Sequence, residues 1–307
     1  MKIDSYHNLN MSKEISFDSL TVVIVLYKES FDLISNTLSK IKNFKIIIVD
    51  NDGNDHLKKK ILSNFKIDEY ILNKKNTGFS AGYNKGLKLS RTIFSLVLGP
   101  DCIIFEKDIF LLIRKLIKYD DALIVSPTSY DEQNNLTYAG GPLPEYDEKN
   151  TILNIRGDVC VNNTLGACML FRTKDLKEKN LFFDENFFLY FSDDDLCRRV
   201  KLTKRSIIQI FDAKCIHQHG NIKIKNIYFK MFIREYNFFF DQLYYFYKIN
   251  KHHDLIISFK KKIPSLIIKL FIKLITFQYL GVVKNFSKIF AYYKFKRKFL
   301  RRGGRAV

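Results

Sequence analysis

The sequence of 307 residues has no tryptophan, only five prolines and only five cysteines. The cysteines are odd in number and scattered, with no CxxC pair, which argues against a disulfide framework or a zinc site and fits a reducing cytosol. The first 20 residues lack an apolar core, so we expect no signal peptide. The chain also has no internal repeat and no low-complexity segment.

Acidic residues are scarce in the last part of the chain. Residues 1–220 hold 31 Lys and Arg against 29 Asp and Glu, whereas residues 221–307 hold 20 against Glu235, Asp241 and Asp254 alone. The net charge of +19 therefore belongs almost wholly to the C-terminal part. Since 47% of the residues are hydrophobic, the chain can build a large core. We expect a nearly neutral globular part followed by a strongly basic one.

Short β-branched runs alternate with segments of helical spacing. The runs are LTVVIVLY (20–27), FKIIIVDND (44–52), IFSLVLGPD (93–101), ALIVSPTS (122–129) and TLGACMLFR (164–172). Continuous apolar runs are typical of parallel strands buried on both faces. The pattern predicts an α/β fold with a doubly wound, mostly parallel sheet flanked by helices, whose ligands bind outside the carboxyl ends of the strands. Tyr27, Asp50 and Asp101 close three of these strands, so we expect them to face one crevice.

Several of these polar residues have two interpretations. Asp50, in IIIVDNDG, is typical of a turn, although an acid at a strand end also binds the ribose or base in α/β nucleotide folds. Asp101, in LGPD, is again typical of a turn, although a diphosphate-bound Mg²⁺ or Mn²⁺ needs only one or two protein carboxylates. His217 and His219, in CIHQHG, form an HxH pair that suits a metal, but an isolated pair is more often structural. Taken singly, each signal favours the structural interpretation.

Glycines recur four residues apart in NTGFSAGYNKGL, at Gly78, Gly82 and Gly86. The segment does not read GxGxxG and no Walker lysine-serine pair follows it, which excludes the dinucleotide and P-loop motifs. The glycines would let a helix pack closely, or let backbone amides approach a phosphate at a helix N-terminus. The spacing alone does not decide between the two.

Three consecutive aspartates stand in LYFSDDDLCRRV, residues 189–200. Acids are favoured at the start of a helix by its dipole, so a solvated helix start is the simpler interpretation. Consecutive carboxylates also repel one another, and a folded chain keeps them together where a proton must be taken up or a metal held.

The order of these segments carries more information than any one of them. TVVIVLYKE, IIIVDNDG, NTGFSAGYNKGL, LGPD, GACMLFR, FDENFFLYFSDDDLCRR and HQHG together resemble the inverting family 2 glycosyltransferases. Rhamnosyltransferase-like enzymes of bacterial surface polysaccharide assembly are the most similar group, and the resemblance covers roughly residues 20–220. It implies a GT-A fold, a nucleotide-sugar donor, a divalent metal (Mg²⁺ or Mn²⁺) on the diphosphate, and transfer with inversion.

The resemblance also implies roles for particular residues, each assigned by its position in a motif. The implied donor-binding residues are Leu26, Tyr27 and Glu29 at the nucleoside, Asp50 at the base, Asn76, Gly78 and Asn84 along the donor, and Gly166 and Ala167 beside the donor sugar and acceptor. Asp101 matches the second acid of the metal motif, and His217 matches a histidine that assists the metal or diphosphate. Asp193 matches the catalytic base, and Asp195 the acid that follows it.

A single-displacement reaction needs one carboxylate to take the acceptor hydroxyl proton, and a crowded acidic cluster raises the proton affinity of one member.

Two positions depart from the family pattern. Ser192 stands where relatives have Glu before the base, and Gly99 stands where they commonly have Asn or an acid. The departures leave Asp101 as the one carboxylate of LGPD, with His217 as a compensating ligand. They also leave open a second function, a catalytically inactive scaffold. For an active enzyme, galactosyl, galactofuranosyl and N-acetylhexosaminyl donors are the alternatives to a rhamnosyl donor.

From about residue 222 the pattern becomes helical, aromatic and basic. Lys269 and Lys273 interrupt the apolar run IPSLIIKLFIKLITFQYLGVV, which makes it a poor spanning helix and a better interfacial one. A solvated helical subdomain and nucleic-acid binding are the alternatives, the latter the weakest. We therefore predict an N-terminal extension (1–19), a GT-A catalytic domain (20–221) and a membrane-surface and acceptor region (222–307). The expected enzyme is cytoplasmic, peripheral on the inner face of the membrane, and extends a polyprenyl-diphosphate-linked saccharide.

Overall fold

The computed structural model describes residues 15–138, 141–146, 156–218 and 224–300. The predicted boundary between residues 221 and 222 lies outside the described residues, as do His219 and most of the predicted N-terminal extension.

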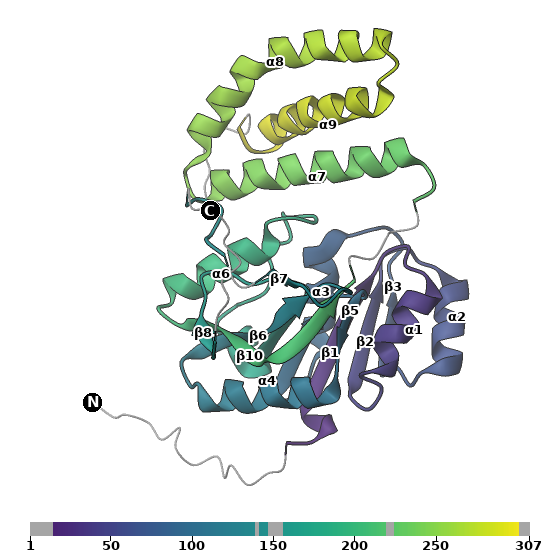
Figure 1. Cartoon of the computed structure of the whole chain (residues 1–307), viewed down its shortest axis with the longest axis vertical. Helices are drawn as coiled ribbons and strands as arrows, with labels where there is room; N and C mark the ends of the chain where they lie inside the picture. Colours follow the sequence, from purple (N-terminus) through teal and green to yellow (C-terminus); the bar gives the residue numbers. More distant parts are fainter. Residues whose placement is uncertain (1–14, 139–140, 147–155, 219–223, 301–307) are drawn as a thin grey trace.

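Strands and helices alternate along the first half of the chain (Figure 1). The strands are β1 (Leu20–Leu26), β2 (Lys45–Asp50), β3 (Glu69–Leu72), β4 (Phe94–Leu98), β5 (Cys102–Ile104), β6 (Ala122–Tyr130), β7 (Leu136–Tyr138), β8 (Val159–Cys160), β9 (Cys168–Arg172) and β10 (Ser206–His217). The helices are α1 (Phe31–Ser39), α2 (Asp55–Asn64), α3 (Gly78–Leu89), α4 (Glu106–Lys118), α5 (Thr173–Glu178), α6 (Ser192–Leu202), α7 (Ile227–Lys248), α8 (His252–Ile275) and α9 (Tyr279–Phe295), with short turns η1 (Phe17–Ser19) and η2 (Lys296–Leu300).

All the strands belong to one sheet, in the order β3-β2-β1-β4-β9-β6-β10-β5, with β7 added to β6 and β8 to β10. The predicted α/β fold is confirmed. β1 pairs parallel with β2 and β4, whereas β9 runs antiparallel to β4 and β6. Among the described residues no helix lies between β6 and β9, so β9 lacks the crossover that a parallel strand requires. The sheet is therefore mixed, because β3-β2-β1-β4 and the pair β6-β10 are parallel while β9 runs antiparallel between them.

Both faces of the sheet are covered. Side chains of β1 alternate, with Val22 and Ile24 in the cluster under α1, α2 and α4, and Val23 and Val25 in the cluster under α3, α5 and α6. At Gly86 in α3 a Cβ would lie 2.3 Å from Cγ1 of Val23. The glycine spacing within α3 therefore serves close packing of this helix on the sheet.

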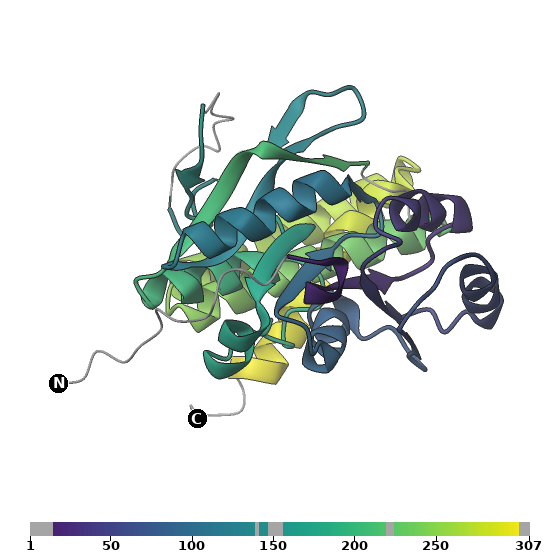
Figure 2. The same cartoon turned by 90° about the horizontal axis from the view of Figure 1, so that it is seen from below.

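The last three helices form a third hydrophobic cluster beyond the α/β part (Figure 1). α7 is the nearest of them to the sheet, and α8 and α9 form a hairpin on its far side. In the view from below, α4 lies across the opposite side of the molecule from this hairpin (Figure 2). Among the described residues, none of the helices combines the length and apolar character that crossing a membrane requires.

Candidate active site

Three acidic side chains surround the carboxyl ends of β1, β2 and β4. Glu29 follows β1, and its carboxylate accepts a hydrogen bond from the backbone N–H of Tyr27. Burial raises the pKa of Glu29 to about 7; these backbone hydrogen bonds oppose the shift, and the charges of Asp101 and Asp50 add to it. Because β1 pairs parallel with both β2 and β4, the three carboxyl groups lie at the same edge of the sheet, where the sequence predicted the nucleoside. Leu26, the last residue of β1, is fully buried beside Asp50 in the parallel pair.

Asp50 has the hydrogen bonds of a turn residue. Its Oδ1 accepts from the backbone N–H of Asp52 at 2.8 Å and of Gly53 at 3.1 Å, and its Oδ2 accepts from the Tyr70 hydroxyl at 3.1 Å. The side chain is fully buried. Asp50 therefore shapes the loop after β2, and its direct contact with a base stays a prediction.

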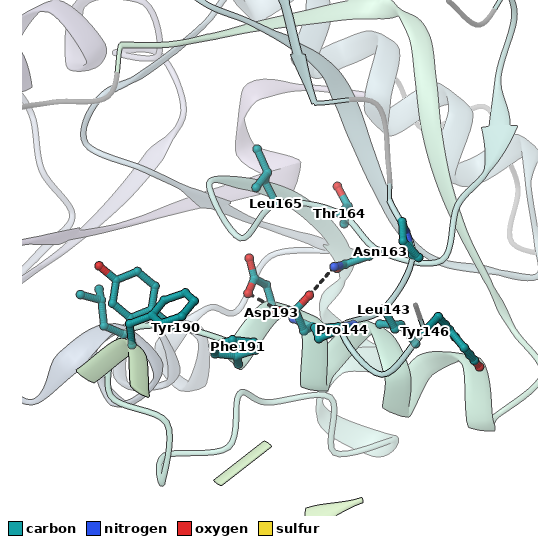
Figure 3. A pocket seen from close by; sticks show the side chains of 13 residues that line it. Leu143, Pro144, Tyr146, Asn163, Thr164, Leu165, Tyr190, Phe191 and Asp193 are labelled. Carbon is teal, nitrogen blue, oxygen red and sulfur yellow. Dashed lines mark hydrogen bonds between the residues drawn. The ribbon is translucent and has the colours of Figure 1, made fainter. Parts of the chain in front are cut away.

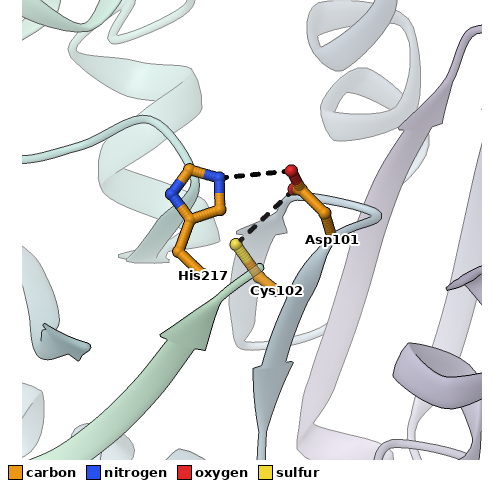
Figure 4. A group of neighbouring side chains, drawn as sticks. All are labelled: Asp101, Cys102 and His217. Atoms are coloured by element: carbon orange, nitrogen blue, oxygen red, sulfur yellow. Dashed lines mark hydrogen bonds and ion pairs between the residues drawn. The ribbon is translucent and has the colours of Figure 1, made fainter. Parts of the chain in front are cut away.

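Asp101 and His217 meet at the end of β10 (Figure 4). The Nε2 atom of His217 lies 3.3 Å from Oδ2 of Asp101. Burial works to lower the pKa of His217, but the hydrogen bond and charge of Asp101 outweigh it and raise the pKa. Gly99 is one of the two departures from the family pattern. A side chain at this position would crowd Asp101, because a Cβ there would lie 3.0 Å from Oδ1 of Asp101. The N–H of Gly99 also donates to the carbonyl of Ala167 at 2.7 Å, which joins this turn to the start of β9.

The residues present fit a divalent cation. One ligand atom each from Asp101, Cys102 and His217 lies within 4.8 Å of the others. The carboxylate suits Mg²⁺ or Mn²⁺ and the imidazole is a common metal ligand. Cys102 is the least suited of the three, because Mg²⁺ and Mn²⁺ prefer carboxylate, carbonyl and water oxygens to a thiolate sulfur. Asp101 and His217 are thus the pair suited to an ion.

The aspartate triplet begins helix α6, and its first member faces a cavity (Figure 3). Oδ2 of Asp193 accepts the backbone N–H of Gly166 at 3.0 Å. Burial raises the pKa of the Asp193 carboxyl, and the N–H of Gly166 opposes the shift. A Cβ at Gly166 would lie 2.8 Å from the Phe79 ring and 3.3 Å from Cβ of Asp193, so glycine permits this approach. Asp193 is a partly buried carboxylate held at a cavity wall.

The cavity has a volume of about 520 Å³ and lies between the segment before β9, the start of α6 and helix α7. Asp194 lines it beside Asp193 and accepts a hydrogen bond from the Asn163 amide. Burial, followed by the charge of Asp193, raises the pKa of Asp194 to about 8. Aromatic side chains complete the wall, namely Tyr146, Tyr190, Phe191 and Phe238. Rings beside carboxyl groups offer stacking and hydrogen bonding to a polyol.

Asp195 has a different environment from its two neighbours. The residue is 2% exposed. Its Oδ2 lies 2.9 Å from Nε of Arg199, and its Oδ1 lies 2.7 Å from Nζ of Lys248. Both oxygens are thus in ion pairs, which makes Asp195 a link between α6 and α7. Ser192, the other departure from the family pattern, is buried at the first turn of α6.

The predicted donor loop contacts the segment that leads to the triplet. Gly78 has φ of 84°, and a Cβ there would lie 2.4 Å from the carbonyl oxygen of Phe188. Its N–H donates to Oδ1 of Asn76 at 2.9 Å. Asn84 is buried and binds the backbone of Phe183 in both directions, at 2.8 and 2.9 Å. These residues hold the 183–188 segment against α3, and their contact with a donor stays a prediction.

Helix α7 contributes positioning residues that the motifs did not predict. Both oxygens of Asp241, which is fully buried, accept backbone N–H groups of Phe188 (3.2 Å), Leu189 (2.9 Å) and Tyr190 (2.9 Å). The Tyr245 hydroxyl donates to Glu145, whose neighbours in the sequence, Pro144 and Tyr146, line the cavity. The sequence feature that could have indicated Asp241 is the rarity of acidic residues after residue 220, because an acidic residue in so basic a segment is expected to have a specific partner.

Comparison with known proteins found similarities in sequence and in fold. The chain is 28% identical over 230 residues to the low-salt glycan biosynthesis hexosyltransferase Agl10 of Haloferax volcanii, covering 69% of this chain and 71% of the relative. Its fold resembles GalNAc-T7, solved with UDP, GalNAc and Mn²⁺, with a TM-score of 0.53 and 13% identity over 66% of this chain and 44% of that one. S. aureus TarS matches 71% of this chain and 39% of its own, at 17% identity and a TM-score of 0.49. This chain thus spans less than half the length of either solved protein.

The predicted GT-A fold is confirmed by the similarity to GalNAc-T7. The model of the glycosyl transferase family 2 matches residues 21–180, from β1 through β9 and α5. That is more than half of the 307 residues, and this protein therefore belongs to glycosyl transferase family 2.

Proposed function

We propose that the protein is a metal-dependent inverting glycosyltransferase that moves L-rhamnose from dTDP-L-rhamnose onto a lipid-linked oligosaccharide. Its place is the cytoplasmic face of the membrane, in the assembly of a surface polysaccharide. The observation that carries the proposal is Asp193, a carboxylate of raised pKa at the wall of a polyol-sized cavity. The rhamnosyl donor follows from the motif resemblance, and galactosyl, galactofuranosyl and N-acetylhexosaminyl donors are the alternatives.

In the proposed reaction Asp193 takes the proton of the acceptor hydroxyl as its oxygen attacks the anomeric carbon of the donor. The bond between this carbon and the diphosphate oxygen breaks, and the nucleoside diphosphate leaves with the electron pair. Attack from the face opposite the leaving group inverts the anomeric carbon. The N–H of Gly166 keeps the Asp193 carboxylate oriented toward the cavity, and burial keeps its proton affinity high.

On the donor side, Glu29 and the loop shaped by Asp50 would border the nucleoside. Asp101 and His217 would hold Mg²⁺ or Mn²⁺, which supplies neutralisation of the charge on the departing diphosphate. The cavity beside Asp193, walled by Tyr190 and Phe238 among others, would take the acceptor saccharide.

The test is nucleotide release from a panel of nucleotide sugars with a lipid-linked acceptor, with and without Mg²⁺ or Mn²⁺, for wild type and Asp193→Asn. We expect one donor to turn over only with metal, and the variant to lose 10²- to 10⁴-fold in kcat, roughly the range for a general base. Turnover of a hexosamine donor would correct the sugar and keep the mechanism. No turnover of any donor with acceptor present would favour the inactive scaffold.

A further inference from the structure

We call the junction of α8 and α9, residues 267–280, the hairpin tip. Its large apolar side chains are exposed to solvent. Ile275 and Phe277 are each 75% exposed and Phe271 is 63% exposed. Exposure above 60% elsewhere in the described residues occurs at single positions such as Ile93 and Leu202, and the start of α7 carries a shorter, less exposed apolar run at residues 227–229. Scattered apolar residues are normal on a surface, whereas a contiguous patch marks a binding surface.

Four exposed residues of the hairpin tip share one side of α8, and Ile267 (42% exposed) and Leu274 (51% exposed) add apolar surface next to that side. Ile268, Phe271, Ile272 and Ile275 follow the i, i+3, i+4, i+7 spacing of a single helix face. The buried residues of α8, which pack on α7 and α9, are His252, Phe259 and Ile263, all in its first half. The second half of α8 therefore extends past the core of the helical cluster with its apolar face uncovered.

Phe277 adds an independent observation. It follows α8 with φ of 58°, at a turn closed by the hydrogen bond from the N–H of Gln278 to the carbonyl of Lys273 (2.8 Å). Glycine is favoured at this helix-ending position, since a side chain there is strained. The Phe277 ring lies 6.1 Å from the ring of Tyr279 and is otherwise largely in water. Folding of this chain does not account for an aromatic residue at that position, whereas an external apolar partner does.

The charge of the hairpin tip indicates which kind of partner binds there. Asp254 is the last acidic residue of the sequence, so the hairpin tip has cations and no acids. Lys262 and Lys269 are exposed on α8, and Lys284 is exposed on α9. Two copies of this surface would bring like charges together, which disfavours self-association. A membrane with anionic lipid offers an apolar layer under a negative surface, which matches both features.

We propose that the hairpin tip is a membrane-docking surface, in which Phe271, Ile275 and Phe277 enter the interfacial layer and the neighbouring lysines contact anionic headgroups. This refines the proposed function, which requires the enzyme to meet a lipid-linked acceptor. α7 packs against both α8 and α9 and contributes Phe238 to the cavity. Docking at the tip thus joins the membrane to the acceptor cavity through one helix.

The experiment is co-sedimentation of the full chain with vesicles of neutral phosphatidylcholine, with and without anionic phosphatidylglycerol. We expect binding to the anionic vesicles that weakens with salt. The variant Phe271→Ser/Ile275→Ser/Phe277→Ser should lose about tenfold in partition coefficient for each side chain. Neutralising Lys262 and Lys269 together should cost about fivefold for each lysine.

Matched controls use equally exposed residues away from the tip. Ile93→Ser/Leu202→Ser should bind as wild type, as should Lys59→Gln/Lys66→Gln, and circular dichroism melts check that all variants fold. Binding that survives the triple serine change overturns the proposal. So does a tip-dependent dimer without vesicle binding, or equal binding to neutral vesicles. Donor turnover without vesicle binding overturns the docking surface alone, whereas vesicle binding without turnover overturns only the proposed glycosyl transfer.

Discussion

Asp195→Asn should destabilise the protein and spare most of its activity, the reverse of Asp193→Asn. The Asp195 side chain is 3% exposed and lies 2.9 Å from Arg199 and 2.7 Å from Lys248. Removing one partner from a fully buried ion pair costs about 3–5 kcal/mol. The side chains of Arg199 and Lys248 are 26% and 30% exposed, so solvent screening lowers the expected loss to about 2–3 kcal/mol.

For Asp193 we expect the opposite result, a small effect on stability and a large effect on activity. Its hydrogen bonds come from backbone N–H groups of Gly166 and Asp194, and an asparagine carbonyl can still accept such a bond. Burial raises the pKa of Asp193, which means that the folded state penalises its charge. Asp193→Asn should therefore stay within about 1 kcal/mol of wild type in unfolding free energy. Its kcat should nevertheless fall by the factor expected for a lost base.

The assay pairs urea denaturation with nucleotide release for the two variants at pH 7. We expect a lower unfolding midpoint for Asp195→Asn with turnover largely kept, and the converse for Asp193→Asn. The reasoning is refuted if Asp195→Asn keeps wild-type stability while abolishing turnover, since Asp195 would then be the base and its ion pairs incidental.

Three further changes test other parts of the structure. Gly86→Ala should lower the unfolding free energy by roughly 1–3 kcal/mol in urea titration, because its Cβ would meet Val23 at 2.3 Å; an unchanged midpoint would contradict the packing of α3. The pKa of Glu29 is raised to about 7, so wild type loses stability as pH rises from about 4.5 to 7, and Glu29→Gln should be more stable by roughly 2–3 kcal/mol at pH 8 yet equal at pH 4. A parallel pH dependence in both proteins would contradict that assignment. Chelation by EDTA should abolish nucleotide release, and Asp101→Asn or His217→Gln should raise the metal concentration needed for half-maximal release; an unchanged requirement would remove these residues from the metal site.

The strands could be predicted from the sequence because their signal is local. Runs such as residues 46–49 are β-branched and apolar, and such runs are stable where both faces of a parallel strand are buried. The order of the polar segments that close the strands was enough to predict the family and the GT-A fold. The antiparallel direction of β9 was not predictable in this way, because an apolar run reads the same in either direction.

The candidate site was predictable only as a set of segments. Asp101 lies in the turn between β4 and β5 and His217 ends β10, and they meet because β5 and β10 pair with His217 opposite Cys102. The motif predicts that Asn84 contacts the donor, and the structure adds a contact that the motif did not indicate, from its amide to the backbone of Phe183. Such pairings depend on strand register and helix packing, which residue spacing along the chain does not specify.

The three aspartates show most directly which properties of the site can be predicted from the sequence and which depend on the tertiary structure. The amino-acid order alone showed three adjacent carboxyl groups in a segment that resembles the catalytic segment of family 2 glycosyltransferases, followed by a basic, acid-poor segment. Only the tertiary structure decided that Asp193 faces the cavity while Asp195 pairs with Lys248 of α7. The physical reason is that successive helical residues point about 100° apart, so identical neighbours enter different surroundings, and packing determines which of them meets solvent, substrate or an opposite charge.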